Sequence, residues 1–331
     1  MTFTRGLIVG KFYPPHSGHH FLIDSALSSC DTLDVLVCDA LGERIPAETR
    51  AAWLRESHPD ALVTVIPDLP GKGDDSIAWA SYTRQLGFTP DCVFTSEDYG
   101  EIYARELGCS HVLVDRERMT HPISGTAVRE NPHEHWSFLQ PMVRAWFVRR
   151  FCIVGAESTG TTTLCEDLAR EYNTLWVPEY GREYSAVKSA AGTFEDPWSI
   201  DEFVEIAREQ QRREEELARI VTPGPAGALL FCDTDALATA VWLERYLGVS
   251  SSEVEDLASH GRYEHYFLTG DEIPFVQDGL RDGEHLRGWM HQRFLERLIG
   301  AELPFTELRG DRYTRVANAN AVISGETEQQ A

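Results

Sequence analysis

The chain has 331 residues, which is enough for two domains of ordinary size, and 42% of them are apolar, as in folded globular proteins. Its formal net charge of −23 argues against nonspecific binding to DNA or to anionic membranes, because both kinds of binding need a positive field. No apolar run approaches the ~20 residues of a membrane-spanning helix. The seven cysteines form no CxxC pair and no signal peptide precedes them, so we expect a cytoplasmic protein with reduced thiols.

The first chemical signal lies between an apolar run, residues 6–9, and a helical pattern that begins at Gly18. The run predicts the first strand of a parallel sheet, and two prolines keep the chain extended after it. His16 and His19 are therefore expected where a strand ends and a helix begins, and there backbone N–H groups and the helix dipole favour a phosphate. Lys11, one of only three lysines in the chain, adds a cation to this predicted phosphate site.

Alternating strand and helix signals continue through the first 114 residues. Further strands are expected at residues 33–38, 62–66, 92–96 and 111–114, and helices at residues 46–57, 76–86 and 99–107. This alternation is typical of parallel βαβ units in a doubly wound α/β sheet, in which ligands bind at the carboxyl ends of the strands.

The segment I-S-G-T-A-V-R at residues 123–129 follows these units. Ser124 is expected to cap a short helix, with Arg129 one turn inside it. Together with H-S-G-H at residues 16–19, the segment resembles the HxGH nucleotidyltransferase superfamily and its ISxTxxR element. Members of that superfamily transfer a nucleotidyl group from a nucleoside triphosphate to a phosphate or carboxylate.

The resemblance implies roles for particular residues of the first domain. It implies that Lys11, His16 and His19 contact the triphosphate, and that Ser124, Thr126 and Arg129 hold the departing pyrophosphate. It also implies that Gly10, Phe12 and Gly18 take part in binding ATP.

An apolar strand at residues 151–154 precedes a glycine-bounded loop and a helical pattern, in the order of a P-loop. The loop fits G-x-x-x-x-G-K-[ST] at every position but one, where Thr161 replaces the lysine. We expect the loop amides to cradle phosphates and Thr162 to bind Mg²⁺, while the lysine's contact with the β/γ-phosphates is unfilled. The predicted loop residues are Gly155, Glu157, Ser158, Thr159, Gly160, Thr161, Thr162 and Thr163.

Three later segments place polar residues at expected strand ends or in loops. Behind a P-loop, they indicate a small-molecule kinase. Asp233 and Asp235 end an apolar run; Glu179, Tyr180 and Arg182 follow a short strand at residues 176–177; and Arg281 lies in residues 277–283, a glycine-containing segment typical of a mobile lid. We expect Asp233 to be catalytic and to hold Mg²⁺ with Thr162, and Asp235 and Glu179 to contact substrate hydroxyls.

The rest of the second half is expected to complete this domain. A long helix covers residues 200–220, and its Glu214-Glu215-Glu216 run is expected on a solvated face. The last strand is expected at residues 305–308 and a final helix from Arg312. These expectations give domains at residues 1–149 and 150–324 and a disordered tail at residues 325–331.

An HxGH domain followed directly by a P-loop kinase domain resembles the NadR-type family, which pairs nicotinamide-nucleotide adenylyltransferase with ribosylnicotinamide kinase. The resemblance implies a Rossmann-like parallel sheet followed by a P-loop kinase-like parallel sheet. It implies that nicotinamide mononucleotide attacks ATP in the first domain, giving NAD and pyrophosphate, and that ATP phosphorylates nicotinamide riboside in the second. Mg²⁺ would serve as cofactor. Trp53 and Arg50 would bind the mononucleotide, although Trp53 can equally be a core residue of its helix.

Some NadR-type proteins begin with a helix-turn-helix repressor domain. Here the first strand is expected within a few residues of Met1, so DNA binding is not expected. Two alternatives stay open: the second domain can be a nucleotide sensor that lacks turnover, and the first can act on another phosphate substrate, such as a phosphopantetheine or a sugar phosphate. Formation of a homo-oligomer also stays open.

Overall fold

The computed structural model describes residues 2–69, 75–192, 197–279 and 281–325, and the chain divides after Arg144 into two compact units. Each unit holds one five-stranded sheet in which all paired strands are parallel. This confirms the expected α/β class with two parallel sheets. The division falls inside helix α6 (Pro141–Phe147), a few residues before the expected boundary.

The first unit is built around strand β1, which carries the predicted phosphate loop at its carboxyl end. The sheet order is β3-β2-β1-β4-β5, so the order reverses beside β1 and a crevice forms between the carboxyl ends of β1 and β4. Its strands are β1 (Phe3–Gly10), β2 (Cys30–Asp39), β3 (Ala61–Pro67), β4 (Cys92–Thr95) and β5 (Ser110–Leu113). Its helices are α1 (Ser17–Leu27), α2 (Ala47–Ser57), α3 (Ser76–Gln85), α4 (Tyr99–Leu107), α5 (Gly125–Glu130), the 3₁₀ turn η1 (Trp136–Phe138) and α6.

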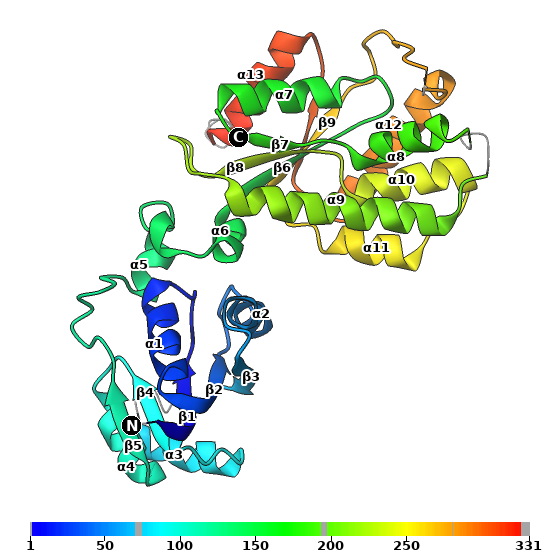
Figure 1. Ribbon diagram of the computed structural model, residues 1–331. Helices are drawn as coiled ribbons and strands as arrows, with labels where there is room; N and C mark the ends of the chain where they lie inside the picture. The colour runs from blue at the N-terminus through cyan, green and yellow to red at the C-terminus, as the bar shows by residue number, and fades with distance from the viewer. Residues whose placement is uncertain (1, 70–74, 193–196, 280, 326–331) are drawn as a thin grey trace. The chain divides into compact units, whose positions relative to one another are not determined.

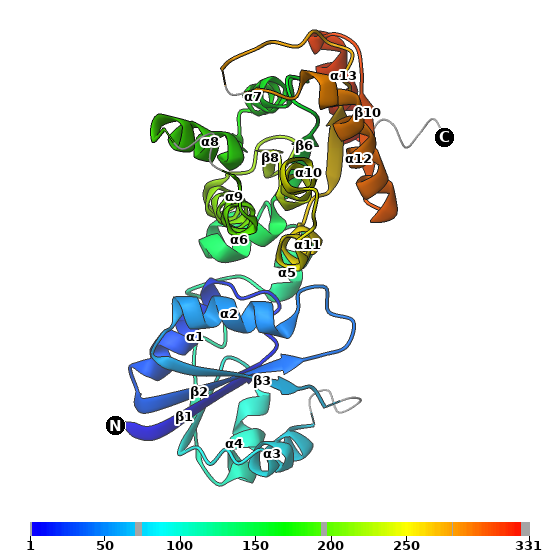
Figure 2. The same ribbon diagram turned by 90° about the vertical axis from the view of Figure 1, so that its right-hand side faces the viewer.

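The helices of this unit cover both faces of the sheet. Figure 2 shows α1 and α2 on one face and α3 and α4 on the other. Along β2, Leu33, Val35 and Val37 belong to the core that includes α1 and α2, whereas Leu36 and Cys38 belong to the core that includes α3 and α4. The side chains of β2 alternate between the two faces because a strand has a two-residue period. Since helices cover both faces, the sequence of β2 is apolar at nearly every position from Leu33 to Cys38.

The second unit repeats this plan around β6, with the sheet order β10-β9-β6-β8-β7. Its crevice therefore opens beside the carboxyl end of β6, which leads into the P-loop. Its strands are β6 (Arg149–Val154), β7 (Leu175–Val177), β8 (Leu229–Asp233), β9 (His265–Thr269) and β10 (Phe305–Leu308). Its helices are α7 (Thr161–Glu171), α8 (Tyr180–Ala190), α9 (Ile200–Ile220), α10 (Ala236–Leu247), α11 (Ser252–Ser259), the 3₁₀ turn η2 (Glu284–Leu286), α12 (Arg287–Gly300) and α13 (Arg312–Ile323).

Three phenylalanines from adjacent strands form the centre of one face of the second sheet. The ring of Phe151 lies 5.8 Å from that of Phe231 and 5.9 Å from that of Phe267. These rings pack with buried residues of α7 and α13, while α9 and α10 lie on the other face (Figure 1). The packing fixes the start of α7, and with it the end of the P-loop.

Most elements lie within a few residues of their expected positions, but β9 and helices α8, α10, α11 and α12 were not predicted. The expected tail at residues 325–331 lies outside the described residues except for Gly325. All seven cysteines are free thiols, as expected. Within the described ranges, no helix combines the length and the apolarity needed to cross a membrane.

The expectation that the Glu214 run is solvated is wrong for its first residue. Glu214 is 2% exposed, and both of its carboxylate oxygens lie within 2.9 Å of the Tyr263 hydroxyl. One turn earlier in α9, the buried Gln210 accepts the backbone N–H of Tyr180 at 2.9 Å and so fixes the start of α8. Burial raises the pKa of Glu214 to about 8, so this carboxyl is protonated in the folded protein at neutral pH.

We expect Glu214→Gln to change how stability depends on pH. In the wild type, the unfolded chain releases this proton near pH 4.5 and the folded protein near pH 8, so stability falls as pH rises between these values. Glutamine is neutral throughout, so the melting temperature of the variant should gain on that of the wild type between pH 5 and pH 8.5. Glu216→Gln, at an exposed neighbour, is the control. Parallel profiles for the wild type and Glu214→Gln would contradict this assignment.

Candidate functional site

A cavity of about 760 Å³ opens at the carboxyl ends of β1 and β4 in the first unit. Its lining brings together two segments that are far apart in sequence, the β1–α1 loop and the start of α5. Of the residues predicted for the first domain, those that line it are Gly10, Lys11, Phe12, His16, Gly18, His19, Ser124, Thr126 and Arg129.

The two histidines stand at the N-terminus of α1. The carbonyl of His16 accepts the N–H groups of His19 at 2.8 Å and His20 at 3.1 Å, and the rings of His16 and His19 stack with centroids 3.8 Å apart. A Cβ on Gly18 would lie 3.2 Å from the His16 ring, so the glycine permits this close approach. Among the described residues, the Nδ1 atoms of His16 and His19 meet no hydrogen-bonding partner.

Both imidazoles are neutral near pH 7. Burial, followed by the nearby His20 and Arg118, lowers the pKa of His16 to about 3. Burial and the adjacent His16 lower the pKa of His19 well below its usual value. A neutral imidazole keeps one N–H donor, so each ring can donate a hydrogen bond to an anionic oxygen without bringing a charge.

Lys11 supplies a cation at the edge of this cavity. Its side chain is 55% exposed, and its Nζ lies 3.6 Å from a carboxylate oxygen of Glu43 and 3.7 Å from one of Asp68. Arg50 is fully buried: it donates to the carbonyl oxygen of Lys11 and pairs with Glu43 at 2.6 Å. Arg50 does not line the cavity but fixes the backbone that presents Lys11.

The start of α5 is attached to the β1–α1 loop through Arg129. Arg129 donates to the carbonyl oxygen of Tyr13 at 2.5 Å and to the Thr126 hydroxyl at 3.1 Å, and its guanidinium lies 4.7 Å from the centroid of the Tyr13 ring. Ser124 caps α5, as expected, by accepting the N–H of Ala127 at 3.2 Å. The structure therefore brings the two predicted elements together.

Some residues of this cavity were not identified from the sequence. Trp53 is 8% exposed and does not line it, whereas Trp79 and Arg118 do. Trp79 belongs to the first turn of α3, which follows strand β3. Its position in the helix after an expected strand end was the signal that could have identified it.

The second unit contains a cavity of about 170 Å³ at the carboxyl end of β6. Its floor is the P-loop, and only Thr159 among the predicted loop residues does not line it. Other predicted residues that line it are Glu179, Arg182, Asp233 and Arg281.

Hydrogen bonds made by the side chains of Ser158 and Thr159 hold the P-loop in a bent conformation. Ser158 adopts a left-handed φ of 59°, and its hydroxyl accepts the N–H of Val276 at 2.8 Å. The Thr159 hydroxyl bonds to the carbonyl of Ala156 and lies 2.7 Å from the hydroxyl of Thr269. Gly155 has no room for a side chain, because a Cβ there would lie 2.1 Å from the hydroxyl oxygen of Thr269.

Thr162 and Asp233 form a pair suited to Mg²⁺. The Thr162 hydroxyl donates to Asp233 at 2.5 Å, and both residues line the cavity. Hydroxyl and carboxylate oxygens are the hard ligands that Mg²⁺ prefers, and this ion usually takes only one or two protein ligands beside phosphate and water. The pair therefore fits the ion, although the described residues contain no cluster of three or more His, Cys, Asp or Glu suited to a metal.

Glu179 lies beside this pair and has no capping role on α8. Burial, followed by the charge of Asp233, raises the pKa of Glu179, and burial also raises the pKa of Asp233. Two carboxyl groups with raised pKa values in one cavity are typical of a site that binds a cation or accepts a proton.

Two arginines of the second cavity share one carboxylate. Arg182 pairs with Asp278, and the Nε of Arg281 lies 3.2 Å from the same oxygen of Asp278. Arg281 also donates to the hydroxyl of Ser158 in the P-loop at 3.3 Å. A pair of guanidinium groups that holds a carboxylate in this position can also hold a phosphate.

Two predicted residues lie elsewhere. Asp235 caps α10 by accepting the N–H of Ala238 at 2.9 Å, and it accepts the Tyr266 hydroxyl at 2.7 Å. The ring of Tyr180 lies 4.4 Å from the guanidinium of Arg213. Neither Asp235 nor Tyr180 lines the cavity.

An aromatic wall of the second cavity was also missed. It consists of Trp198, Phe203, Trp242 and Tyr246, and the Trp198 ring lies 5.3 Å from Phe203 and 5.4 Å from Tyr246. Lys188 stands 4.2 Å over the Trp198 ring. These aromatic residues come from separate segments and from α10, which was not predicted, so their grouping depends on the tertiary structure.

Comparisons with known proteins find relatives of both units. A family model described as AAA domain matches residues 150–315. The trifunctional NAD biosynthesis/regulator protein NadR of Escherichia coli (strain K12) is 30% identical over 300 residues, which cover 84% of this chain and 72% of that protein. A nicotinamide-nucleotide adenylyltransferase of Pyrobaculum arsenaticum is 28% identical over 176 residues, 47% of this chain and 93% of that one.

A solved structure has the same fold over nearly the whole chain. It is a NadR protein in complex with NR, with a TM-score of 0.71 and 25% identity, and the match covers 98% of this chain and 96% of that one. Because the E. coli protein reaches 30% identity and this chain spans 72% of it, the chain belongs to the NadR family.

Proposed function

We propose that the first unit transfers the adenylyl group of ATP to nicotinamide mononucleotide, giving NAD and pyrophosphate, and that the second unit phosphorylates nicotinamide riboside with ATP. The observation that carries the proposal is the meeting of residues 16–19 and 123–129 around one cavity. Membership of the NadR family supports it. We assign the first activity to residues 1–149 and the second to residues 150–324, in a cytoplasmic protein, which its free thiols favour.

In the first unit, the attacking group is the phosphate of the mononucleotide. It is already ionised, so no side chain has to remove a proton and no covalent enzyme intermediate is needed. The protein then contributes orientation and stabilisation of the crowded phosphate oxygens. We assign hydrogen-bond donation to His16 and His19 and positive charge to Lys11 and Arg129.

The flat, cationic nicotinamide ring can stack on an aromatic side chain. Trp79 lines the cavity, while Trp53 does not, so we propose Trp79 as the tryptophan that contacts the ring. Arg50, which binds the backbone carbonyl of Lys11, then acts as a positioning residue.

In the second unit, the P-loop amides and Thr162 face the phosphates of ATP, and Thr162 and Asp233 would hold Mg²⁺. When bound, Mg²⁺ neutralises charge on the phosphates. Glu179 is the group we assign to the riboside hydroxyl, because it lines the cavity beside Asp233. The aromatic wall of Trp198, Trp242 and Tyr246 provides a stacking surface for a flat ring.

Thr161 favours a second candidate function for this unit, an ATP-binding sensor without turnover. The two arginines that share Asp278 favour turnover, because they can replace the lysine's charge at the β/γ-phosphates. ADP formation from ATP in the presence of nicotinamide riboside separates the two functions, since adenylyl transfer releases pyrophosphate and no ADP.

We expect His19→Ala to lower NAD formation from the mononucleotide by at least ~10²-fold, the usual effect of removing one preorganised donor. The residue lies in the first turn of α1 on an open cavity, so the fold should survive, which circular dichroism checks. His260→Ala, at an exposed histidine of the second unit, should leave the rate unchanged. A folded His19→Ala protein with near-normal turnover would refute the assigned role.

We expect the rate of ADP formation from ATP with nicotinamide riboside as acceptor to collapse in Arg281→Ala or Arg182→Ala, because each substitution removes a cation from the phosphate cavity. Arg208→Ala, which removes an exposed arginine of α9, is the matched control. Full activity in the double variant Arg182→Ala/Arg281→Ala would show that neither arginine replaces the lysine. Absence of ADP in the wild type, with ATP still bound, would establish the sensor.

A further inference from the structure

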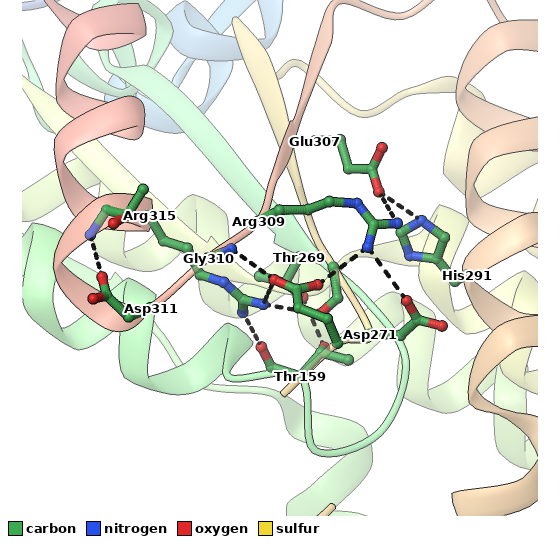
Figure 3. Close-up of polar contacts among 12 residues, drawn as sticks. Thr159, Thr269, Asp271, His291, Glu307, Arg309, Gly310, Asp311 and Arg315 are labelled. Carbon is green, nitrogen blue, oxygen red and sulfur yellow. Dashed lines mark hydrogen bonds and ion pairs between the residues drawn. The ribbon is translucent and has the colours of Figure 1, made fainter. Parts of the chain in front are cut away.

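Arg315 of α13 does not line the second cavity, yet its side chain reaches the P-loop (Figure 3). Its Nη1 donates to the carbonyl oxygen of Thr159 at 2.6 Å, and its Nη2 donates to the carbonyl oxygen of Gly270 at 3.0 Å. The side chain is 5% exposed. A buried guanidinium is therefore bonded to the backbone of the loop to which we assign phosphate binding.

The bond to Thr159 acts on a peptide group whose N–H belongs to a residue that lines the cavity. The carbonyl of Thr159 and the N–H of Gly160 belong to the same peptide unit, and Gly160 lines the cavity. A cation bonded to the carbonyl polarises the unit and makes its N–H a stronger donor, because hydrogen bonds in a chain reinforce one another at low dielectric. Positive charge can thus act in the cavity although the guanidinium stays outside it.

The loop is fixed around this bond. The Thr159 hydroxyl bonds to Thr269 and to the carbonyl of Ala156, so both the side chain and the carbonyl of Thr159 have partners (Figure 3). Arg315 joins the loop to Gly270 at the end of β9. The loop is consequently held ready for a phosphate and does not have to be ordered by one.

Glu272 is the acidic partner of Arg315. Its Oε1 lies 2.8 Å from Arg315 and accepts the N–H of Gly310 at 2.7 Å, while its Oε2 lies 3.3 Å from Arg309. One carboxylate thus serves two guanidinium groups, and Arg309 also contacts Asp271 and Glu307 (Figure 3).

We infer that Arg315 is a positioning residue of the second site: it presets the P-loop and supplies, through the Thr159–Gly160 peptide, part of the positive charge that Thr161 does not provide. The inference rests on the proposed function of the second unit. It explains how a P-loop without its lysine retains a favourable field for the phosphates of ATP.

The test uses the full chain with ATP, Mg²⁺ and nicotinamide riboside. Arg315→Gln should raise the KM for ATP in ADP formation on the order of tenfold or more, the effect of losing a charged hydrogen bond. It should also reduce the protection that ATP gives to the amides of residues 155–163 in hydrogen exchange. Arg315→Lys keeps the charge and should restore most of the affinity. Arg312→Gln, on the same helix but paired with Asp167 at the surface, should change neither quantity.

Each outcome bears on the inference. A folded Arg315→Gln protein with an unchanged KM and unchanged protection would overturn it, and so would equal losses in Arg315→Lys and Arg315→Gln, which would show that charge is not the cause. If the wild type forms no ADP but ATP protects the loop, the kinase proposal fails and the protection data alone decide the inference. If ATP does not protect the loop of the wild type, both are wrong.

A second variant covers the case in which Arg315→Gln fails to fold. Glu272→Gln keeps the shape of the carboxylate and its accepting oxygen but removes the charge that competes for Arg315. We expect a lower KM for ATP, because more of the guanidinium charge then acts on the loop. A purely structural role of Arg315 predicts an unchanged or higher KM, and either result would overturn the inference.

Discussion

The proposed function of both units depends on the hydrogen bonds that backbone N–H groups at a helix N-terminus can make to a phosphate. In each unit a central parallel strand, β1 or β6, ends in a loop that leads into the next helix, and the cavity opens at that point. Under the proposed function, the first amides of these helices donate to the phosphates of ATP. The surrounding side chains fix the conformation of each loop, and some of them carry positive charge while others, such as His16 and His19, are neutral.

The two sites carry their positive charge on different residues, in a chain whose net charge is −23. The first cavity is lined by one lysine, two arginines (Arg118 and Arg129) and the imidazoles of His16 and His19, which burial keeps neutral. The second has no lysine in its loop and brings arginines from three separate segments: Arg182 and Arg281 beside the cavity, and Arg315 against the loop carbonyl. Positive charge at these points is compatible with a strongly acidic chain, because charge–charge interactions are strong at short distance in a low dielectric and are screened by salt at long distance.

The sequence allowed the fold class and the loops to be predicted because their signals are local. Apolar runs and helix caps such as Ser124 depend on neighbouring residues only. The strand His265–Thr269, the aromatic wall around Trp198 and the contact of Arg315 with Thr159 depend on tertiary packing. The burial of Glu214 belongs to the same class, since a run of three glutamates gives no local sign that one of them faces a core.

The two sites are proposed to perform successive phosphate chemistry, and the most direct test is the balance of products from the full chain. With ATP, Mg²⁺ and nicotinamide riboside, the account predicts equal amounts of ADP, pyrophosphate and NAD once the mononucleotide is consumed. With the mononucleotide in place of the riboside, it predicts pyrophosphate and NAD without ADP. If NAD forms with the mononucleotide but no ADP forms with the riboside, the account of the second site is contradicted. If no pyrophosphate forms with the mononucleotide, the account of the first site is contradicted.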